Sequence, residues 1–253
     1  MLSPLQQIIY NVMYERGAQY VLRSESAIAA QYPGKPLWLY AEEGWGADNL
    51  RAFFHACLQK KLDLSGLVSS KWAHEICLAG LAGLAGNPLS ASWEVAAFYL
   101  AQAIEYRPKG RLVFPSISDV PTLSEWIGTF YQEALSSEFK PKDRTIEALV
   151  AGKKLYCLEH EGIGLCAMGM RVPLESDDYK MGRLNMIYTP AKYRGMGFGK
   201  DITAAIAMQV QSQKRLPVLY ARLNNKVAIN LYRQLGFAEA GRLVEARFTE
   251  KQP

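Results

Sequence analysis

Apolar residues in the second half of the chain recur at two different spacings, and the change from one to the other marks successive strands and helices. Spacings of three and four residues predict helices, the first of which opens at Pro121 or Thr122. Shorter apolar runs predict strands. The expected helices cover residues 121–136, 143–151, 202–210 and 225–235, and the expected strands cover 111–117, 155–159, 163–171, 183–188, 218–223 and 237–248. The pattern therefore predicts an α/β unit in the order β-α-α-β-β-β-α-β-α-β.

The first 109 residues carry a weaker version of the same pattern. Strands are expected at 37–40 and 67–69, and helices at 48–60, 71–84 and 93–103. We therefore divide the chain into an N-terminal α/β domain of residues 1–109 and a C-terminal domain of residues 110–253.

Composition narrows the class of protein. The 253 residues are 49% hydrophobic and 21% charged, which is typical of a globular protein, and the net charge is +5. This mild positive charge suits a ligand that carries phosphates, but it is far from the concentrated basic stripe of a nucleic-acid-binding protein. The longest uncharged stretch, residues 76–93, is broken by glycine and proline, so no membrane span is expected. The N-terminus shows no signal-peptide pattern, which makes the cytoplasm the expected location.

The cysteines and histidines do not form a metal-ligand pattern. Cys57, Cys77, Cys157 and Cys166 are widely separated, and no Cys-x-x-Cys spacing occurs. The three histidines are also unclustered. We expect reduced thiols in the core and no metal site.

A glycine-rich segment stands between the expected strand 183–188 and the helix that follows it. Its sequence is Arg194-Gly195-Met196-Gly197-Phe198-Gly199. Glycines allow a close approach of the backbone, whose N–H groups converge at the positive end of the helix dipole. The segment therefore predicts an anion site, most simply one for a pyrophosphate.

Two common phosphate-binding loops do not match this spacing. A P-loop needs four residues between its first glycine and Gly-Lys, followed by Ser or Thr; here three residues separate Gly195 from Gly199, and Asp201 follows Lys200. The dinucleotide fingerprint needs G-x-G-x-x-G early in a βαβ unit, whereas this chain has G-x-G-x-G late in the sequence.

A second block follows the expected strand 218–223. It runs from Asn225, which has the chemistry of a helix N-cap, through Ala228, Leu231 and Tyr232 to Gly236-Phe237. Taken alone, the block predicts only an amphipathic helix with a C-terminal stop.

Together the two blocks resemble motifs A and B of the GCN5-related N-acetyltransferases, the GNAT family. The family's loop, Arg/Gln-x-x-Gly-x-Gly/Ala, is matched by Arg194, Gly197 and Gly199, and its second block reads Asn-x-x-Ala-x-x-Leu-Tyr before Gly-Phe. The resemblance implies the GNAT fold, a central mixed sheet flanked by helices. It also implies that the N-terminal domain is a smaller, degenerate GNAT-like half without the glycine loop; an unrelated α/β extension that completes the core stays open.

The resemblance further implies acetyl-CoA as the acyl donor. In this family the strands before and after the loop splay apart, the first pairs with the pantetheine amides, and the loop holds the pyrophosphate. Backbone N–H groups near Met186 to Tyr188 would stabilise the oxyanion. The residues expected to bind acetyl-CoA are Met186, Ile187, Tyr188, Arg194, Gly195, Met196, Gly197, Phe198, Gly199, Lys200 and Asn225.

Catalysis in this family commonly uses a tyrosine of the second block as general acid, and Tyr232 holds that position. Its alternative role is core packing. Many members carry a glutamate base on the strand before the loop, but that strand offers Asn185 here. The base therefore stays open among Glu133, Glu159, Asp177, Asp178 and a water chain.

The expected function is acetyl transfer to a primary amine by direct attack in a ternary complex. The alternative is a non-catalytic acyl-CoA-binding or regulatory module. We expect a small-molecule or peptide amine as partner, and no nucleic acid or membrane. The acceptor, the length of the acyl group and a homodimeric assembly stay open, as does any part of the N-terminal half in the active site. Acceptor pockets in such folds lie near the first helices, here around 126–131 and 177–179.

Overall fold

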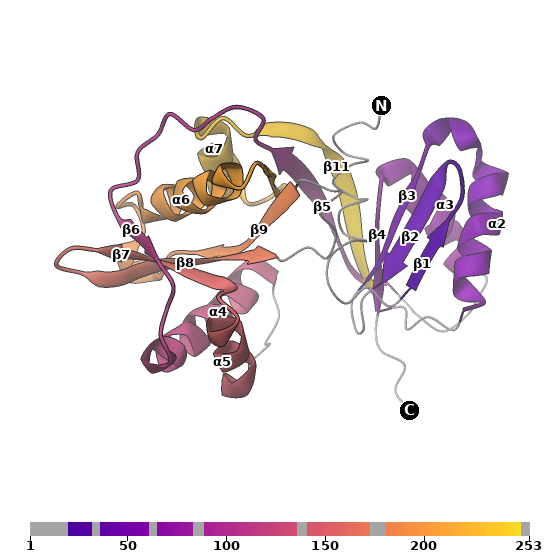
Figure 1. Cartoon of the computed structure of the whole chain (residues 1–253). Helices are drawn as coiled ribbons and strands as arrows, with labels where there is room; N and C mark the ends of the chain where they lie inside the picture. The colour runs from indigo at the N-terminus through magenta and orange to yellow at the C-terminus, as the bar shows by residue number, and fades with distance from the viewer. Residues whose placement is uncertain are drawn as a thin grey trace.

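The computed structural model describes residues 20–31, 36–60, 65–82, 89–135, 141–172 and 181–248. Within these ranges the chain forms one mixed sheet of eleven strands with helices packed on both of its faces (Figure 1). The expected fold class, a mixed sheet flanked by helices, is confirmed.

The C-terminal half has the predicted order of elements. Its strands are β6 (Arg111–Val113), β7 (Leu155–His160), β8 (Gly164–Val172), β9 (Met181–Tyr188), β10 (Leu216–Arg222) and β11 (Ala238–Phe248), and its helices are α4 (Val120–Leu135), α5 (Asp143–Ala151), α6 (Phe198–Ser212) and α7 (Lys226–Gln234). One strand is shorter than predicted: β6 ends at Val113, and a 3-10 turn over Ile117–Asp119 follows. Ser116 and Asp119 cap each other at this turn, which ends the extended backbone.

The N-terminal half contains five strands and two helices in the described ranges. They are β1 (Tyr20–Arg23), β2 (Ala27–Gln31), β3 (Leu37–Ala41), β4 (Gly66–Ser69), β5 (Leu89–Tyr99), α2 (Ala47–Leu58) and α3 (Lys71–Ala82), with a 3-10 turn at Glu43–Trp45. The predicted helix over 93–103 is wrong. Residues 95–98 are buried on both faces of a central strand, and such an apolar run does not distinguish a strand from a buried helix.

The sheet is arranged almost symmetrically about its two central strands. The order is β1, β2, β3, β4, β11, β5, β10, β9, β8, β7, β6. The parallel pair β3–β4 is mirrored by the parallel pair β9–β10, and each half places its last strand beside the other half: β11 pairs with β4, and β5 pairs with β10. The two halves therefore exchange strands, and β5 and β11 pair with each other at the centre. The boundary near residue 109 stays a prediction, since the sheet is continuous across it.

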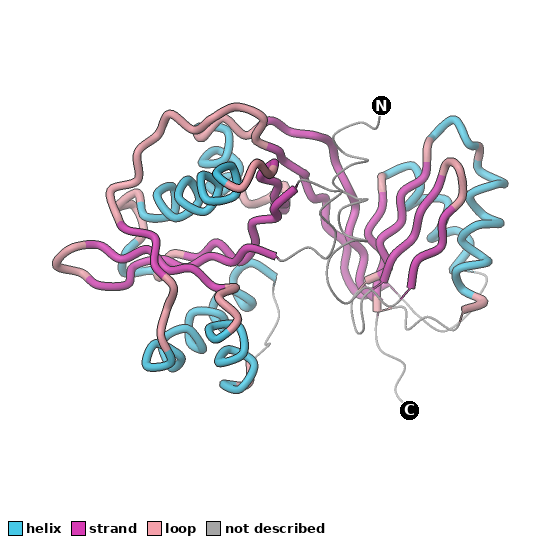
Figure 2. The backbone as a smooth tube through the Cα atoms, viewed as in Figure 1, coloured by secondary structure: helices cyan, strands magenta, loops and turns pink. Residues whose placement is uncertain are grey.

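The helices divide between the two faces. Ala96 on β5 and Ala246 on β11 belong to the same face by their register; Ala96 packs with α6 and α7, and Ala246 packs with α2 and α3. The opposite face of β7, β8 and β9 is covered by α4 and α5 (Figure 2). The loop expected to bind acetyl-CoA precedes α6 on one face, and residues 126–131, expected near the amine acceptor, lie on α4 on the other face.

None of the described helices is long and apolar enough to cross a membrane. The predicted loop of Asp177, Asp178 and Tyr179 lies outside the described residues.

Candidate functional site

Strands β9 and β10 separate after a short parallel contact. They pair only at Leu216–Met181, Pro217–Gly182 and Val218–Arg183, while the rest of β10 pairs with β5 on its other side. Among the described residues, the last part of β9 therefore has no strand partner on the side of β10. This opening agrees with the splay expected from the family resemblance.

The end of β9 is irregular. Met168 pairs with Tyr188 and Met170 with Asn185, so β9 holds one extra residue, and Met186 adopts a φ of 51°. A positive φ is uncommon for a residue with a side chain and marks a constrained backbone. The side-chain oxygen of Asn185 accepts a hydrogen bond from the N–H of Met186 at 2.9 Å. Asn185 thus holds the bulge where the resemblance leads one to expect a basic carboxylate.

The glycine-rich loop has a backbone that only glycine adopts easily. Gly195 has a φ of 76° and Gly197, the N-cap of α6, a φ of 92°. A Cβ atom built at either position meets no atom within 4 Å, so the space above the loop is open. Among the described residues, none accepts a hydrogen bond from the backbone N–H groups of residues 195–199. Five backbone donors without a described acceptor therefore lie at a helix N-terminus, with open space at Gly195 and Gly197, and this arrangement fits a pyrophosphate.

The two large apolar side chains of the loop differ in their exposure to solvent. Met196 is half exposed, whereas Phe198 is buried against His160 and Tyr193. Phe198 therefore contributes only its backbone N–H to the loop, and its ring anchors the start of α6 in the core.

The Arg194 side chain is already engaged. It forms an ion pair of 2.5 Å with Glu133 on α4 and donates from Nε to the carbonyl of Thr189 at 3.0 Å. The guanidinium also lies 5.7 Å from the centre of the Tyr188 ring. Burial and the nearby Glu133 carboxylate raise the pKa of Tyr188. The Arg194 guanidinium, which was expected at the anion site, is thus paired with a carboxylate of α4.

The first turn of α6 is fixed by the segment that joins the two halves. The Tyr106 hydroxyl donates to Oδ1 of Asp201 at 2.5 Å, and burial together with this bond raises the pKa of Tyr106 to about 12. Lys200 lies 4.5 Å from the Tyr106 ring centre. A Cβ on Gly199 would meet Thr189 and Leu231 at 3.3 and 3.5 Å, so glycine allows close packing of α6 there. The Lys200 ammonium is therefore held at the rim of the loop.

Helix α7 places the second block beside the loop helix. The Asn225 side chain accepts a hydrogen bond from the N–H of Ala228 at 3.1 Å, which confirms the predicted N-cap. Tyr232 is 7% exposed and packs between Phe98 and Phe237, with ring centres 6.0 Å apart in each case. No described residue forms a hydrogen bond with its hydroxyl. Burial raises the pKa of Tyr232 to about 12, so the phenol is protonated at neutral pH.

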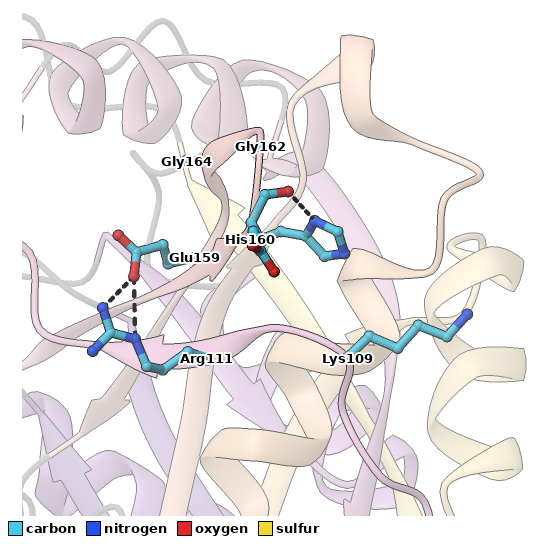
Figure 3. Close-up of a pocket in the computed structure, with 7 residues that line it drawn as sticks. Lys109, Arg111, Glu159, His160, Gly162 and Gly164 are labelled. Carbon is cyan, nitrogen blue, oxygen red and sulfur yellow. Dashed lines mark hydrogen bonds and ion pairs between the residues drawn. The ribbon is translucent and has the colours of Figure 1, made fainter.

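The candidate bases are not brought together at β9. Glu159 pairs with Arg111 at the tip of the β7–β8 hairpin, beside a surface pocket of about 460 Å³ (Figure 3). Lys109 and His160 also line this pocket, which includes no residue of β9 or β10. Glu133 is paired with Arg194, and Asp177 and Asp178 lie outside the described residues. Neither Glu133 nor Glu159, the two candidate bases in the described residues, lies on β9 at the bulge, so the general base is not identified.

The N-terminal half contains a loop at the place equivalent to the glycine-rich loop. Between β3 and α2 the sequence reads Glu42-Glu43-Gly44-Trp45-Gly46, and Gly46 has a φ of 88° just before the helix. Gly44 and Gly46 have the spacing of Gly197 and Gly199, but Ala41 stands three residues before Gly44, where the motif has arginine or glutamine. The exposed Glu43 lies three residues before the N-cap Gly46, as Arg194 lies three residues before the N-cap Gly197, and Glu42 precedes it.

Several contacts at the site were not predicted from the sequence. The Glu133–Arg194 pair joins residues 61 positions apart, and Tyr106 reaches Asp201 over 95 positions.

Comparison with models of protein families gives one match. Residues 174–247 match the model of a family described as FR47-like protein. A search among curated proteins found no match to the chain.

Solved structures with the same fold span nearly the whole chain. A putative acetyltransferase from the GNAT family of Novosphingobium aromaticivorans aligns with a TM-score of 0.59 at 15% identity, over 98% of this chain and 99% of its own. A GCN5-related N-acetyltransferase of Kribbella flavida gives 0.59 at 13% identity, over 99% and 97%. A GNAT-family acetyltransferase of Colwellia psychrerythraea gives 0.57 at 15% identity, over 92% and 84%. The fold, including its N-terminal half, is thus shared with these proteins.

Proposed function

We propose that this chain, whose fold and FR47-like segment support its membership of the GNAT family, transfers an acetyl group from acetyl-CoA to a primary amine. The observation that carries the proposal is the loop before α6. Its N–H groups at 195–199 have no described acceptor, and the space at Gly195 and Gly197 is open, at a helix N-terminus that follows the strand whose end separates from β10. Such a site fits a pyrophosphate with an extended arm that continues into the sheet.

Each residue at the opening has a proposed role in this reaction. The loop N–H groups and Lys200 bind the pyrophosphate, and the end of β9 from Met186 to Tyr188 lies along the pantetheine arm. The Asn225 amide nitrogen donates to the same arm while its oxygen caps α7. Acetyl-CoA supplies the activated thioester. Tyr232, whose phenol is protonated at neutral pH and whose pKa burial raises further, to about 12, donates a proton to the departing sulfur.

Exchange of Glu133 for glutamine is expected to strengthen the binding of acetyl-CoA. The Glu133 carboxylate now neutralises Arg194 at 2.5 Å, and a pyrophosphate competes for the same guanidinium. Both side chains are about half exposed, so the gain is modest, about two- to fivefold in Kd, as for other exposed ion pairs. Calorimetry at low and at high salt measures it, and salt should reduce the gain.

The matched control for this prediction is Glu125→Gln, which removes an equal charge from the same helix at an exposed position eight residues away. Weaker binding in Glu133→Gln than in the control would show instead that Glu133 orients Arg194 for the anion.

We also propose that the N-terminal half is a degenerate GNAT-like unit that binds no donor. Its β3–α2–β4–α3–β5 order mirrors β9–α6–β10–α7–β11, and its loop carries Glu42 and Glu43. A pyrophosphate would meet like charges there, which is unfavourable. The chain therefore offers one donor site and uses its N-terminal half to complete the sheet through β5.

The alternative function is a non-catalytic acyl-CoA-binding module, because in the described part of the chain Asn185, and not a carboxylate, stands at the bulge. One experiment separates the two functions. Calorimetry measures acetyl-CoA binding at one site per chain, and CoA release with a panel of primary amines measures transfer. Binding with turnover supports the enzyme, binding without turnover of any amine supports the module, and absence of binding removes both.

A further inference from the structure

The central part of the sheet carries a cluster of charged and aromatic side chains on the face of α4, at the end of β10. The cluster consists of Arg222 on β10, Trp93 on β5, and Glu245 and Arg247 on β11. The register places all four on one face, because Trp93 pairs with Glu245 and Arg222 pairs with Val95, two residues from Trp93 on the same strand. This face is opposite to the one covered by α6 and α7, and the glycine-rich loop leads into α6.

Arg222 is the central member. Its guanidinium lies 3.7 Å from the centre of the Trp93 ring, and its Nε atom is buried without a hydrogen-bond partner among the described residues. A buried donor without a hydrogen-bond partner is costly. Burial lowers the pKa of Arg222, which agrees with a cation held away from water.

Among the described residues of the cluster, Glu245 is the one carboxylate beside Arg222. The Glu245 carboxylate is within 2.7 Å of Arg247, so one carboxylate serves two guanidinium groups. Both charges act on Arg222, and Arg247 also acts on the Tyr131 phenol of α4. The cluster therefore extends from β10 to the C-terminal half of α4, and its four defining residues include two guanidinium groups and one carboxylate.

The position of the cluster relates it to the transfer reaction. Arg222 ends β10 where this strand has already separated from β9, and Asn225 follows three residues later. Thr129 and Glu133, on the same part of α4, contact the end of β9 through Tyr188 and Arg194. Arg222 therefore ends its strand beside the opening, on the face of the sheet that α4 covers.

We propose that Arg222 binds a carboxylate of the acceptor, so that the substrate is an amine that also carries a carboxylate group. The planar guanidinium, stacked on Trp93, presents its N–H groups in the fixed geometry that a carboxylate accepts in pairs. Residue Arg222 selects the acceptor and takes no part in proton transfer. This inference rests on the proposed acetyl transfer, whose donor site is formed by other residues.

The test compares acceptors that differ only in the second group. Each set holds an amino acid, its carboxamide and the corresponding diamine, for example β-alanine, β-alaninamide and 1,3-diaminopropane, with glycine and 4-aminobutyrate sets for other lengths. CoA release gives kcat/KM for each. We expect one carboxylate acceptor to exceed its carboxamide by about 10- to 100-fold, the range of a hydrogen bond to a charged group.

Variants then assign the preference to Arg222. Arg222→Met should abolish it and leave the Kd of acetyl-CoA unchanged, and Arg222→Lys should restore only part of it because a point charge lacks the stacked fork. The matched control is Arg242→Met, which removes an exposed guanidinium on β11 that pairs with Glu239. This control should keep the full preference.

Two kinds of outcome are distinguishable. Acetyl-CoA binding with equal or better use of the carboxamides or diamines, or an unchanged preference in Arg222→Met, overturns the inference and leaves the proposed function standing. If no amine is turned over, calorimetry of the same sets with the CoA-bound protein decides: selective carboxylate binding supports the inference, and its absence overturns it. Failure to bind acetyl-CoA overturns the proposed function, and the inference that rests on it falls as well.

Discussion

Tyr232→Phe should lower kcat about 100- to 1000-fold and leave the Kd of acetyl-CoA unchanged, within the range that one general acid contributes. The substitution removes only the hydroxyl, which has no hydrogen bond to any described residue. The ring stays packed between Phe98 and Phe237, so the core is preserved. Loss of turnover without loss of donor binding would therefore report on proton donation to the departing sulfur.

The pH dependence gives a second reading of the same residue. An acid works in its protonated form, so activity falls as pH rises through its pKa, which burial raises to about 12 for Tyr232. The wild-type rate should therefore increase with pH as the acceptor amine loses its proton, and it should not decline below about pH 10. The matched control is Tyr193→Phe, which truncates a tyrosine that packs on Phe198 without entering α7. An undiminished rate in Tyr232→Phe, or an equal loss in Tyr193→Phe, would contradict the assignment of Tyr232 as the acid.

Local chemistry explains what could be predicted from the sequence. The loop at 194–199 and the helix capped by Asn225 depend on residues close together in the chain, and both were predicted with their neighbouring strands. Strand β5 was mistaken for a helix because its centre is buried on both faces, which removes the alternation that distinguishes a strand.

Contacts between distant segments explain what could not be predicted. The exchange of β5 and β11 depends on pairing between strands about 150 residues apart, for which neither strand carries a local signal. Arg194 matched the family pattern, yet its contact with Glu133 depends on how α4 packs on β9. The Arg222 cluster unites three strands, and its only trace in the sequence was one charge in an apolar run.

Gly197→Ala should raise the Kd of acetyl-CoA at least about 10-fold, because it disturbs several charge-assisted hydrogen bonds worth roughly 1.5–3 kcal/mol each. The new methyl group enters the open space above the loop, where no protein atom lies within 4 Å. It also favours a negative φ in place of 92°, which would turn the loop N–H groups away from one another. Calorimetry measures the change in affinity, and thermal unfolding measures the loss of stability.

Gly46→Ala is the control that the near-symmetry of the sheet provides. Gly46 is also the N-cap of a helix after a parallel strand, its φ is 88°, and a Cβ there also meets no atom within 4 Å. Its ψ of 150° is less accessible to alanine than the −7° of Gly197, so the strain introduced at Gly46 is at least as large. Gly46→Ala should therefore destabilise the protein as much as Gly197→Ala and leave the Kd of acetyl-CoA unchanged. Equal loss of binding in both variants would mean that strain in the sheet, and not the loop itself, controls the donor site, and it would contradict the proposal that only the C-terminal half binds the donor.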